Sequence, residues 1–112
     1  MLVQTRTIIV TKGNADQVVE RFSKDSPIDG MPGLLDVTVM VNKAKKEDTE
    51  EIVAMIRWES TDAWKNWEKS DAHIQGHRES RGQPKPDYVI SSLVNMYEVK
   101  TVKGGTSAGY RV

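Results

Sequence analysis

Two strand-like segments in the middle of the chain, separated by a short charged run, restrict the fold more than any other feature. Residues 34–42 alternate between apolar and other side chains, and residues 52–58 are again rich in apolar side chains, as strands are. The intervening residues 43–51 read KAKKEDTEE, which is typical of a solvated turn, and no function is assigned to them. Because strands joined by a short turn pair antiparallel, the sequence predicts a central hairpin.

The segment before this hairpin has the pattern of one strand followed by one helix. Residues 2–11 are β-branched and predict a strand. A helix is expected from an N-cap at Asn14, with Gln17 completing a capping box, to about Lys24. Residues 26–33 contain two prolines and two glycines, so they are expected to form a connector that cannot continue the helix.

The segment after the hairpin has a divided helix and a last strand. Ser60 is a predicted N-cap, and Ser70 looks like a fresh N-cap, so the helix is expected to break there and restart. Residues 81–87, which include two prolines, are expected to form a loop, and residues 88–100 the last strand. The resulting order β-α-β-β-α-β is the ferredoxin-like split motif of an α+β domain.

An antiparallel sheet with helices on one face leaves its other face to be covered. Valines and leucines at alternate positions of the second and last strands predict that this open face is apolar. A second copy of the same sheet is the simplest cover, so we expect a homodimer with two sheets face to face. Residues 1–102 are expected to form this one domain, and the small, polar residues 103–112 a flexible C-terminal tail.

The composition excludes several classes of protein. Lys and Arg number 16, as do Asp and Glu, and this balance lacks the basic excess that nucleic acid binding requires. The absence of cysteine excludes disulfides, thiolate metal sites and a cysteine nucleophile. The N-terminus lacks the basic region and cleavage site of a signal peptide, and no apolar run reaches the length of a membrane span. A cytoplasmic protein is therefore expected.

All three tryptophans and both histidines lie within residues 58–80. Since only 6% of the residues are aromatic, this concentration suggests the wall of a pocket for a flat, metal-containing ligand. His77 is the first candidate, because a neutral imidazole coordinates iron and other metals. Trp67 is the second, because it lies one turn before the helix break, where side chains line cavities. Arg6 is the third, and it is either a sheet-edge arginine facing solvent or a carboxylate, or a donor that points into the pocket.

The remaining large side chains of this stretch are expected to have structural roles. His73 and His77 have the i, i+4 spacing of a zinc clamp, but the absence of a glutamate between them and of a third ligand nearby disfavours zinc. His73 is therefore expected in packing or solvent, and Trp58 and Trp64 in the core or the dimer contact. No nucleophile–base–acid set, phosphate loop or dinucleotide motif is visible. The residues alone thus predict a small dimeric domain with an imidazole and an indole around a cavity.

Several segments between residues 2 and 102 carry a family resemblance. They are Thr11-Lys-Gly-Asn14, Val19-Glu-Arg-Phe22, Met31-Pro-Gly-Leu34, Trp58 to Asp71 and, most specifically, Trp67 and Lys69-Ser70 followed by His77. In these segments the chain resembles the IsdG-type heme-degrading monooxygenases, a group within the dimeric α+β barrels that are similar to antibiotic biosynthesis monooxygenases.

The resemblance implies that heme is both substrate and cofactor. O2 and electrons from an external donor, a reductase, would open the porphyrin ring and release iron. His77 looks like the proximal ligand of the heme iron, Trp67 like the bulky residue that ruffles the porphyrin, and Phe22 like part of the distal pocket.

The chain departs from the family pattern in its first strand. The family usually has an asparagine there that donates a hydrogen bond to the bound oxygen, and counting back from Thr11 places Arg6 at this position. Arginine is also a donor, but it is longer and charged, so it could reach an oxygen or a propionate. Two other functions stay open: a heme-binding or transfer protein of the same fold, made slow by Arg6, and a cofactor-independent oxygenase with His77 as acid–base residue and Trp67 as stacking surface.

Overall fold

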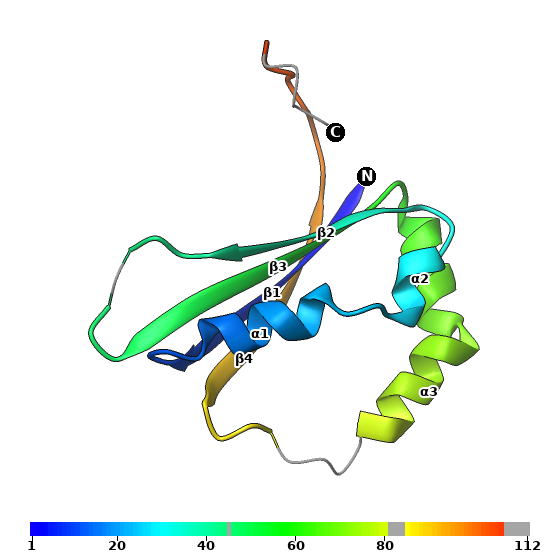
Figure 1. Ribbon diagram of the computed structural model, residues 1–112. Helices are drawn as coiled ribbons and strands as arrows, with labels where there is room; N and C mark the ends of the chain where they lie inside the picture. The colour runs from blue at the N-terminus through cyan, green and yellow to red at the C-terminus, as the bar shows by residue number, and fades with distance from the viewer. Residues whose placement is uncertain (45, 81–84, 107–112) are drawn as a thin grey trace.

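The computed structural model describes residues 1–44, 46–80 and 85–106 (Figure 1). The elements follow one another in the order β1 (Leu2–Thr11), α1 (Ala15–Ser23), the 3-10 helix η1 (Pro27–Gly30), β2 (Leu34–Val41), β3 (Thr49–Trp58), α2 (Thr61–Lys69), α3 (Asp71–Ser80) and β4 (Val89–Glu98). The predicted order of strands and helices is confirmed, and so is the break that divides α2 from α3.

The strands of the described residues form one antiparallel sheet in the order β2-β3-β1-β4. This order is the ferredoxin-like arrangement predicted from the sequence. In Figure 1, α1 lies across one face of the sheet, whereas α2 and α3 lie beyond the end where β1 begins and β3 ends. Helix α3 packs against α2 and η1, so its position depends on these elements more than on the sheet.

Two hydrophobic clusters hold the helices to the sheet. One joins β1 and β3 to α1 through Ile8, Val10, Ala15, Val18 and Ile52, with Phe22 packed against it. The other, around Leu2, Trp58 and Ala63, is covered by Trp64, Trp67 and residues of η1 and β2. Trp58 is completely buried and Trp64 is partly buried against the same cluster, so of the two predicted alternatives, core or dimer contact, both side chains fit the core. Burying aromatic side chains of this size contributes strongly to stability.

Helix α1 is capped differently from the prediction. Asn14 is the N-cap residue, but its side chain accepts no backbone N–H from the described residues, so the expected capping box with Gln17 is wrong. The Asn14 amide instead donates to the Thr11 hydroxyl at 2.8 Å, and its Oδ1 accepts from the Gln17 side chain at 2.6 Å. The N–H groups of Gly13 and Ala15 donate to Glu50 Oε1 at 2.6 and 3.3 Å. A carboxylate from β3 thus satisfies the helix N-terminus.

The break between α2 and α3 is built by serine hydroxyls. Ser60 Oγ accepts the N–H of Ala63 at 3.1 Å, which caps α2 as predicted. Ser70 Oγ donates to the carbonyl of Trp67 at 2.7 Å and accepts the N–H of His73 at 3.2 Å. One hydroxyl therefore ends α2 and starts α3, which fixes the direction of the second helix.

The open face of the sheet differs in part from the prediction. The valines of β2 face the helices, because Val39 packs against the α1 cluster and the register pairs it with buried Ala54. The open face instead carries Met40 together with Leu93 and Tyr97 of β4, all of them exposed. The predicted apolar character of this face therefore holds for β4 and is wrong for the valines of β2.

A polar pair also lies on the open face. Arg57 of β3 donates from Nε to Asp36 Oδ1 at 2.9 Å and from its terminal nitrogen to Oδ2. This hydrogen bonding lowers the pKa of the Asp36 carboxyl below its ordinary value of 3.8. A cross-strand pair with two parallel hydrogen bonds is a specific contact between β2 and β3.

Two segments differ from the prediction. The connector at residues 26–33 contains the short η1 helix, and β3 begins at Thr49, inside the charged run. Residues 81–84 of the predicted loop and 107–112 of the predicted tail lie outside the described residues. None of the helices in the described part of the chain is long and apolar enough to cross a membrane.

Candidate functional site

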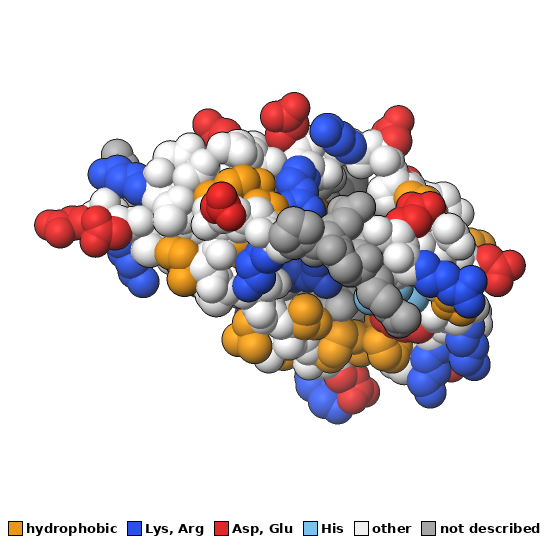
Figure 2. Space-filling model, turned by 90° about the horizontal axis from the view of Figure 1, so that it is seen from below, with side chains coloured by type: hydrophobic (Ala, Val, Ile, Leu, Met, Phe, Trp, Pro, Cys, Tyr) orange, Lys and Arg blue, Asp and Glu red, His pale blue; other side chains and the backbone are white. Residues whose placement is uncertain are grey.

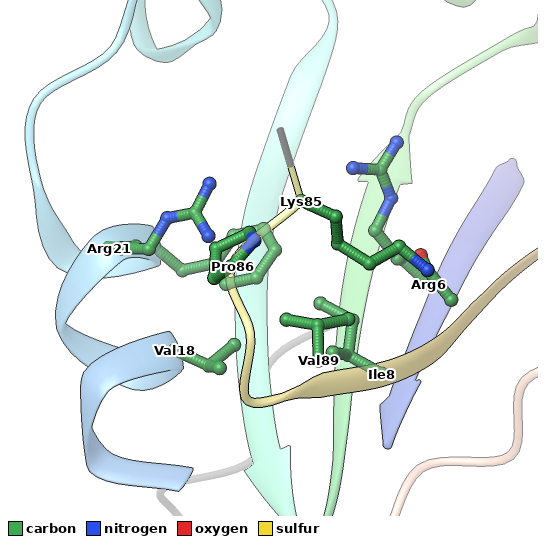
Figure 3. Close-up of a pocket in the computed structure, with 9 residues that line it drawn as sticks. Arg6, Ile8, Val18, Arg21, Lys85, Pro86 and Val89 are labelled. Carbon is green, nitrogen blue, oxygen red and sulfur yellow. The ribbon is translucent and has the colours of Figure 1, made fainter. Parts of the chain in front are cut away.

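A pocket of about 320 Å³ opens between α1, β1 and the start of β4. Its volume lies at the lower end of the range for small-molecule sites, which is about 300–1,000 Å³. Figure 3 shows Arg21 of α1 and Arg6 of β1 on opposite sides, with Lys85 and Pro86 between them. The lining residues are Arg6, Ile8, Val18, Arg21, Phe22, Lys85, Pro86, Val89 and Ser92.

The pocket combines an apolar interior with a positive rim. Arg6, Arg21 and Lys85 contribute three cations, and the described lining contains no carboxylate to balance them. Apart from Ser92, the rest of the wall consists of apolar side chains such as Ile8 and Phe22. In a chain of zero net charge this is a local excess, and it suits a ligand with an apolar body and negatively charged groups.

Arg6 lies in this pocket and is exposed to solvent. Strand β1 lies inside the sheet between β3 and β4, so Arg6 is not at the sheet edge, although the solvent contact of that alternative is present. No carboxylate of the described residues forms an ion pair with Arg6. Its guanidinium is therefore available to a ligand.

Beside Arg6 the apolar wall continues along β4. Val94 pairs with Arg6 in the sheet register and Met96 pairs with Gln4, so both face the helix side, and both are exposed. In Figure 2 hydrophobic side chains form a band next to basic ones, and a histidine is visible further along the same side. The apolar surface is thus larger than the pocket itself.

The second group of predicted site residues lies at the junction of α2 and α3. Trp67, His73 and His77 form a row of rings in edge-to-face contact. The ring centroids of Trp67 and His73 are 5.0 Å apart at an interplanar angle of 70°, and those of His73 and His77 are 4.4 Å apart at 74°. Such contacts are favourable pairings of aromatic rings.

His73 occupies the middle of this row. Its Nε2 lies 2.8 Å from Glu68 Oε2, and its side chain is only 17% exposed. The expectation that His73 belongs to packing or solvent is met by packing. Trp67 is partly buried against the Trp58 cluster, whereas His77 is exposed on the last turn of α3.

The four predicted site residues therefore lie in two groups. Arg6 and Phe22 line the pocket, and Trp67 and His77 belong to the row of rings on α2 and α3. Arg21 and Lys85 were missed by the sequence analysis. A signal for Arg21 was present, because Val18, Arg21 and Phe22 have i, i+3, i+4 spacing and so share one helix face.

The imidazoles do not belong to a larger set of metal ligands. Among the described residues, no group of three or more His, Asp or Glu side chains gathers at one point. A bare zinc ion requires about four ligands, whereas a metal that arrives inside a macrocycle requires one axial ligand. A single accessible imidazole such as that of His77 fits the second case.

The sheet order and the placement of the helices define a ferredoxin-like α+β protein with a partly apolar, cationic pocket and, separately on α3, an exposed imidazole. The chain belongs to the antibiotic biosynthesis monooxygenase family, whose sequence model matches residues 1–79.

Curated and solved relatives agree with this family. The chain is 56% identical over 106 residues to the heme-degrading monooxygenase HmoA of Bacillus subtilis, and the match covers 95% of this chain and 97% of HmoA. A crystal structure from Bacillus cereus, named for the antibiotic biosynthesis monooxygenases, aligns with a TM-score of 0.80 at 38% identity, covering 93% and 97% of the two chains. The expected family resemblance is confirmed.

A more distant structure shares the fold. The heme degrader MhuD from Mycobacterium tuberculosis, solved with two hemes in its active site, aligns with a TM-score of 0.63 at 19% identity. The alignment covers 93% of this chain and 100% of MhuD. At this identity the likeness concerns the fold.

Proposed function

We propose that this chain is a heme-degrading monooxygenase, which binds heme, opens the porphyrin ring with O2 and electrons from a reductase, and releases the iron. The observation that carries the proposal is the 56% identity to HmoA over nearly the whole of both chains. Pocket chemistry supports it independently, because heme has a flat apolar body and two carboxylates, and the pocket offers apolar walls and three cations.

His77 is the residue we assign to the heme iron. It is an exposed imidazole on the last turn of α3, in edge contact with the His73 ring. When bound, heme supplies the iron that reacts with O2 and is itself consumed. Trp67 lies two rings away along the same row, and its bulk would press on the macrocycle and distort it.

Residues on the pocket side would hold the opposite part of the ligand. Phe22 and Ile8 offer apolar contact and exclude water. Arg21 and Lys85 are placed at the rim, where their charges suit the two carboxylates of heme. Arg6 lies on an interior strand of the sheet and carries a positive charge and several N–H donors. It would donate to an oxygen or a carboxylate of the bound molecule.

The proposal includes a homodimer. Leu93, Tyr97 and Met40 are exposed on the open sheet face, and a second copy of this face would cover them in a dimeric α+β barrel. Sedimentation at micromolar concentration should give a dimer, and a stable monomer would exclude this part of the proposal. The proposal also includes a single domain of residues 1–102. It further includes a cytoplasmic location, since a chain without cysteine has no disulfides that would require an oxidising compartment.

The first experiment is a hemin titration followed by visible spectroscopy. Wild-type protein should give a sharpened Soret band, and His77→Ala should lose it. Gln75→Ala is the matched control, because Gln75 is exposed on the same helix and its side chain bonds only to Glu79 among the described residues. An unchanged Soret band in His77→Ala would refute the assigned ligand. Failure of the wild type to bind hemin would leave a cofactor-independent oxygenase.

A further inference from the structure

We propose that His73 is a positioning residue that fixes the orientation of the His77 imidazole and of the Trp67 indole. This inference rests on the proposed function, because it assigns His77 to the heme iron. It is carried by one arrangement: the His73 ring lies between the other two rings and is held by Glu68 across the break between α2 and α3.

The contact with Glu68 fixes the His73 ring. Glu68 belongs to α2 and His73 to α3, and the two atoms that meet, Oε2 and Nε2, are 2.8 Å apart. This close contact with a carboxylate across the helix break restrains the imidazole at one of its nitrogens. A ring held at one nitrogen and 17% exposed has few rotamers left.

The backbone around His73 is fixed as well. Its N–H donates to Ser70 Oγ at 3.2 Å, and the same hydroxyl donates to the Trp67 carbonyl at 2.7 Å. The main chains of Trp67 and His73 are therefore joined through one side chain, and their rings meet 5.0 Å apart. The two residues form one unit at the start of α3.

The Trp67–His73 unit also restricts the rotamers of the His77 side chain. An exposed imidazole on the last turn of a helix has several rotamers, and a ligand that needs one of them loses affinity accordingly. The His73 ring, 4.4 Å from that of His77, blocks one side of its rotation. Metal-binding histidines are usually oriented by neighbouring groups, and the edge of the His73 ring is one such group beside His77.

The geometry also separates the roles of the two histidines. The Nε2 of His73 is engaged by Glu68, and the side chain is largely covered. His77 is exposed, so it is the ring that a large planar ligand reaches. His73 is thus the support and His77 the ligand.

Four variants test this assignment. His73→Ala removes the support, and His73→Phe keeps the ring but not the contact with Glu68. Glu68→Gln keeps a side-chain oxygen for that contact, and Gln75→Ala is the control. In apo-protein, the ¹³C-labelled His77 ring is followed by NMR relaxation. In the ferric hemin complex, the dissociation constant and the electron paramagnetic resonance g-values are measured, because the latter report the orientation of the axial imidazole.

We expect His73→Ala to increase the mobility of the His77 ring, to weaken hemin binding about three- to tenfold and to shift the g-values. His73→Phe should restore only part of the affinity, because its ring lacks the contact with Glu68. Glu68→Gln, which keeps an oxygen at that contact, and Gln75→Ala should stay close to the wild type. A lower melting temperature in His73→Ala with unchanged ring mobility and g-values would overturn the inference, since that pattern indicates a structural role alone.

Two further outcomes are informative. Loss of the Soret band in His73→Ala together with its retention in His77→Ala would make His73 the ligand and overturn the inference. If wild-type protein binds no hemin, the proposed function fails, but the NMR experiment on apo-protein still decides whether His73 orders the His77 ring.

Discussion

At the scale of single residues, Arg6 is the main departure of this site from the asparagine expected in the family. It lies on an interior strand, lines the pocket and has no carboxylate partner among the described residues. If Arg6 is a donor to the reacting end of the ligand, Arg6→Ala should slow hemin degradation about tenfold or more while changing hemin affinity only a few fold. Single-turnover spectroscopy separates the two effects.

The control for this prediction is Lys12→Ala, which removes an exposed cation just beyond the far end of the same strand and should be silent. Arg6→Asn restores a neutral donor, so it should keep binding and alter the rate or the product. A kinetically silent Arg6→Ala would show that Arg6 is no pocket donor.

Trp67 provides a second prediction at this scale. Trp67→Phe keeps an aromatic edge toward His73 but removes part of the bulk that would distort the porphyrin. Hemin binding should stay within about threefold, and degradation should become slower. Trp64→Phe is the matched control, because Trp64 packs on the same cluster and its buried Nε1 has no hydrogen-bond partner among the described residues to lose. Equal degradation rates in wild type and Trp67→Phe would contradict the distorting role.

At the scale of elements, the close packing between α2 and the residue just before β2 depends on one glycine. Gly33 has φ +86°, and a Cβ there would overlap the Cβ of Ala63 and lie 3.2 Å from Glu59 Cγ. Gly33→Ala should therefore cost about 2–4 kcal/mol of unfolding free energy, from the left-handed backbone and from overpacking. Urea unfolding measures it.

Gly13 is the comparison that isolates the packing contribution. Its φ is +90°, but no atom of the described residues outside its chain neighbours lies within 4 Å of the Cβ that an alanine would add at this turn. Gly13→Ala should therefore show only the backbone cost, about 1–2 kcal/mol. Equal losses in the two variants would mean that the contact with Ala63 contributes nothing.

The elements themselves were predictable from local patterns, and their contacts were not. The break at Ser70 follows from a hydroxyl followed by a helical pattern, and the structure confirms it. The capping of α1 by Glu50 could not be predicted, because the carboxylate is separated from Gly13 by 37 residues and arrives through the strand register. The valines of β2 were assigned to the wrong face for the same reason, since alternation does not say which side the helices cover.

The candidate site was predictable to a similar extent. Residue types and family spacing led to the prediction of Arg6, Phe22, Trp67 and His77 as site residues, and did not indicate that they lie in two groups. Lys85 lies in a segment without regular structure, so no helix or strand periodicity could predict its position in the pocket. The role of His73 depends on ring orientation and on Glu68, which a linear spacing does not contain.

At the scale of the whole molecule, acid should weaken the fold through the open sheet face. The pKa of Asp36 is lowered by its hydrogen bonds to Arg57, so the ionised pair adds stability above the ordinary value of 3.8 and this contribution is lost as the pH falls through the lowered pKa. Asp36→Asn should lower the unfolding free energy at neutral pH by about 1 kcal/mol and flatten the decline in acid.

Glu98→Gln serves as the control for this pH experiment. Its partner Lys100 and Glu98 itself are 79% and 71% exposed, and ion pairs on the surface contribute little. Denaturation curves recorded between neutral pH and about pH 2.5 should separate the two variants. If the unfolding free energy of Asp36→Asn depends on pH as that of the wild type does, Asp36 does not contribute to the loss of stability in acid.

The central claim about the molecule is that it consumes the heme it binds. The most direct measurement follows the hemin complex in air after addition of ascorbate, with catalase present and a ferrous chelator to capture iron. We predict that the Soret band disappears and that iron appears in proportion to the heme lost. A Soret band that persists under these conditions, or that decays only when catalase is omitted, would contradict the claim and leave a heme-binding or transfer protein.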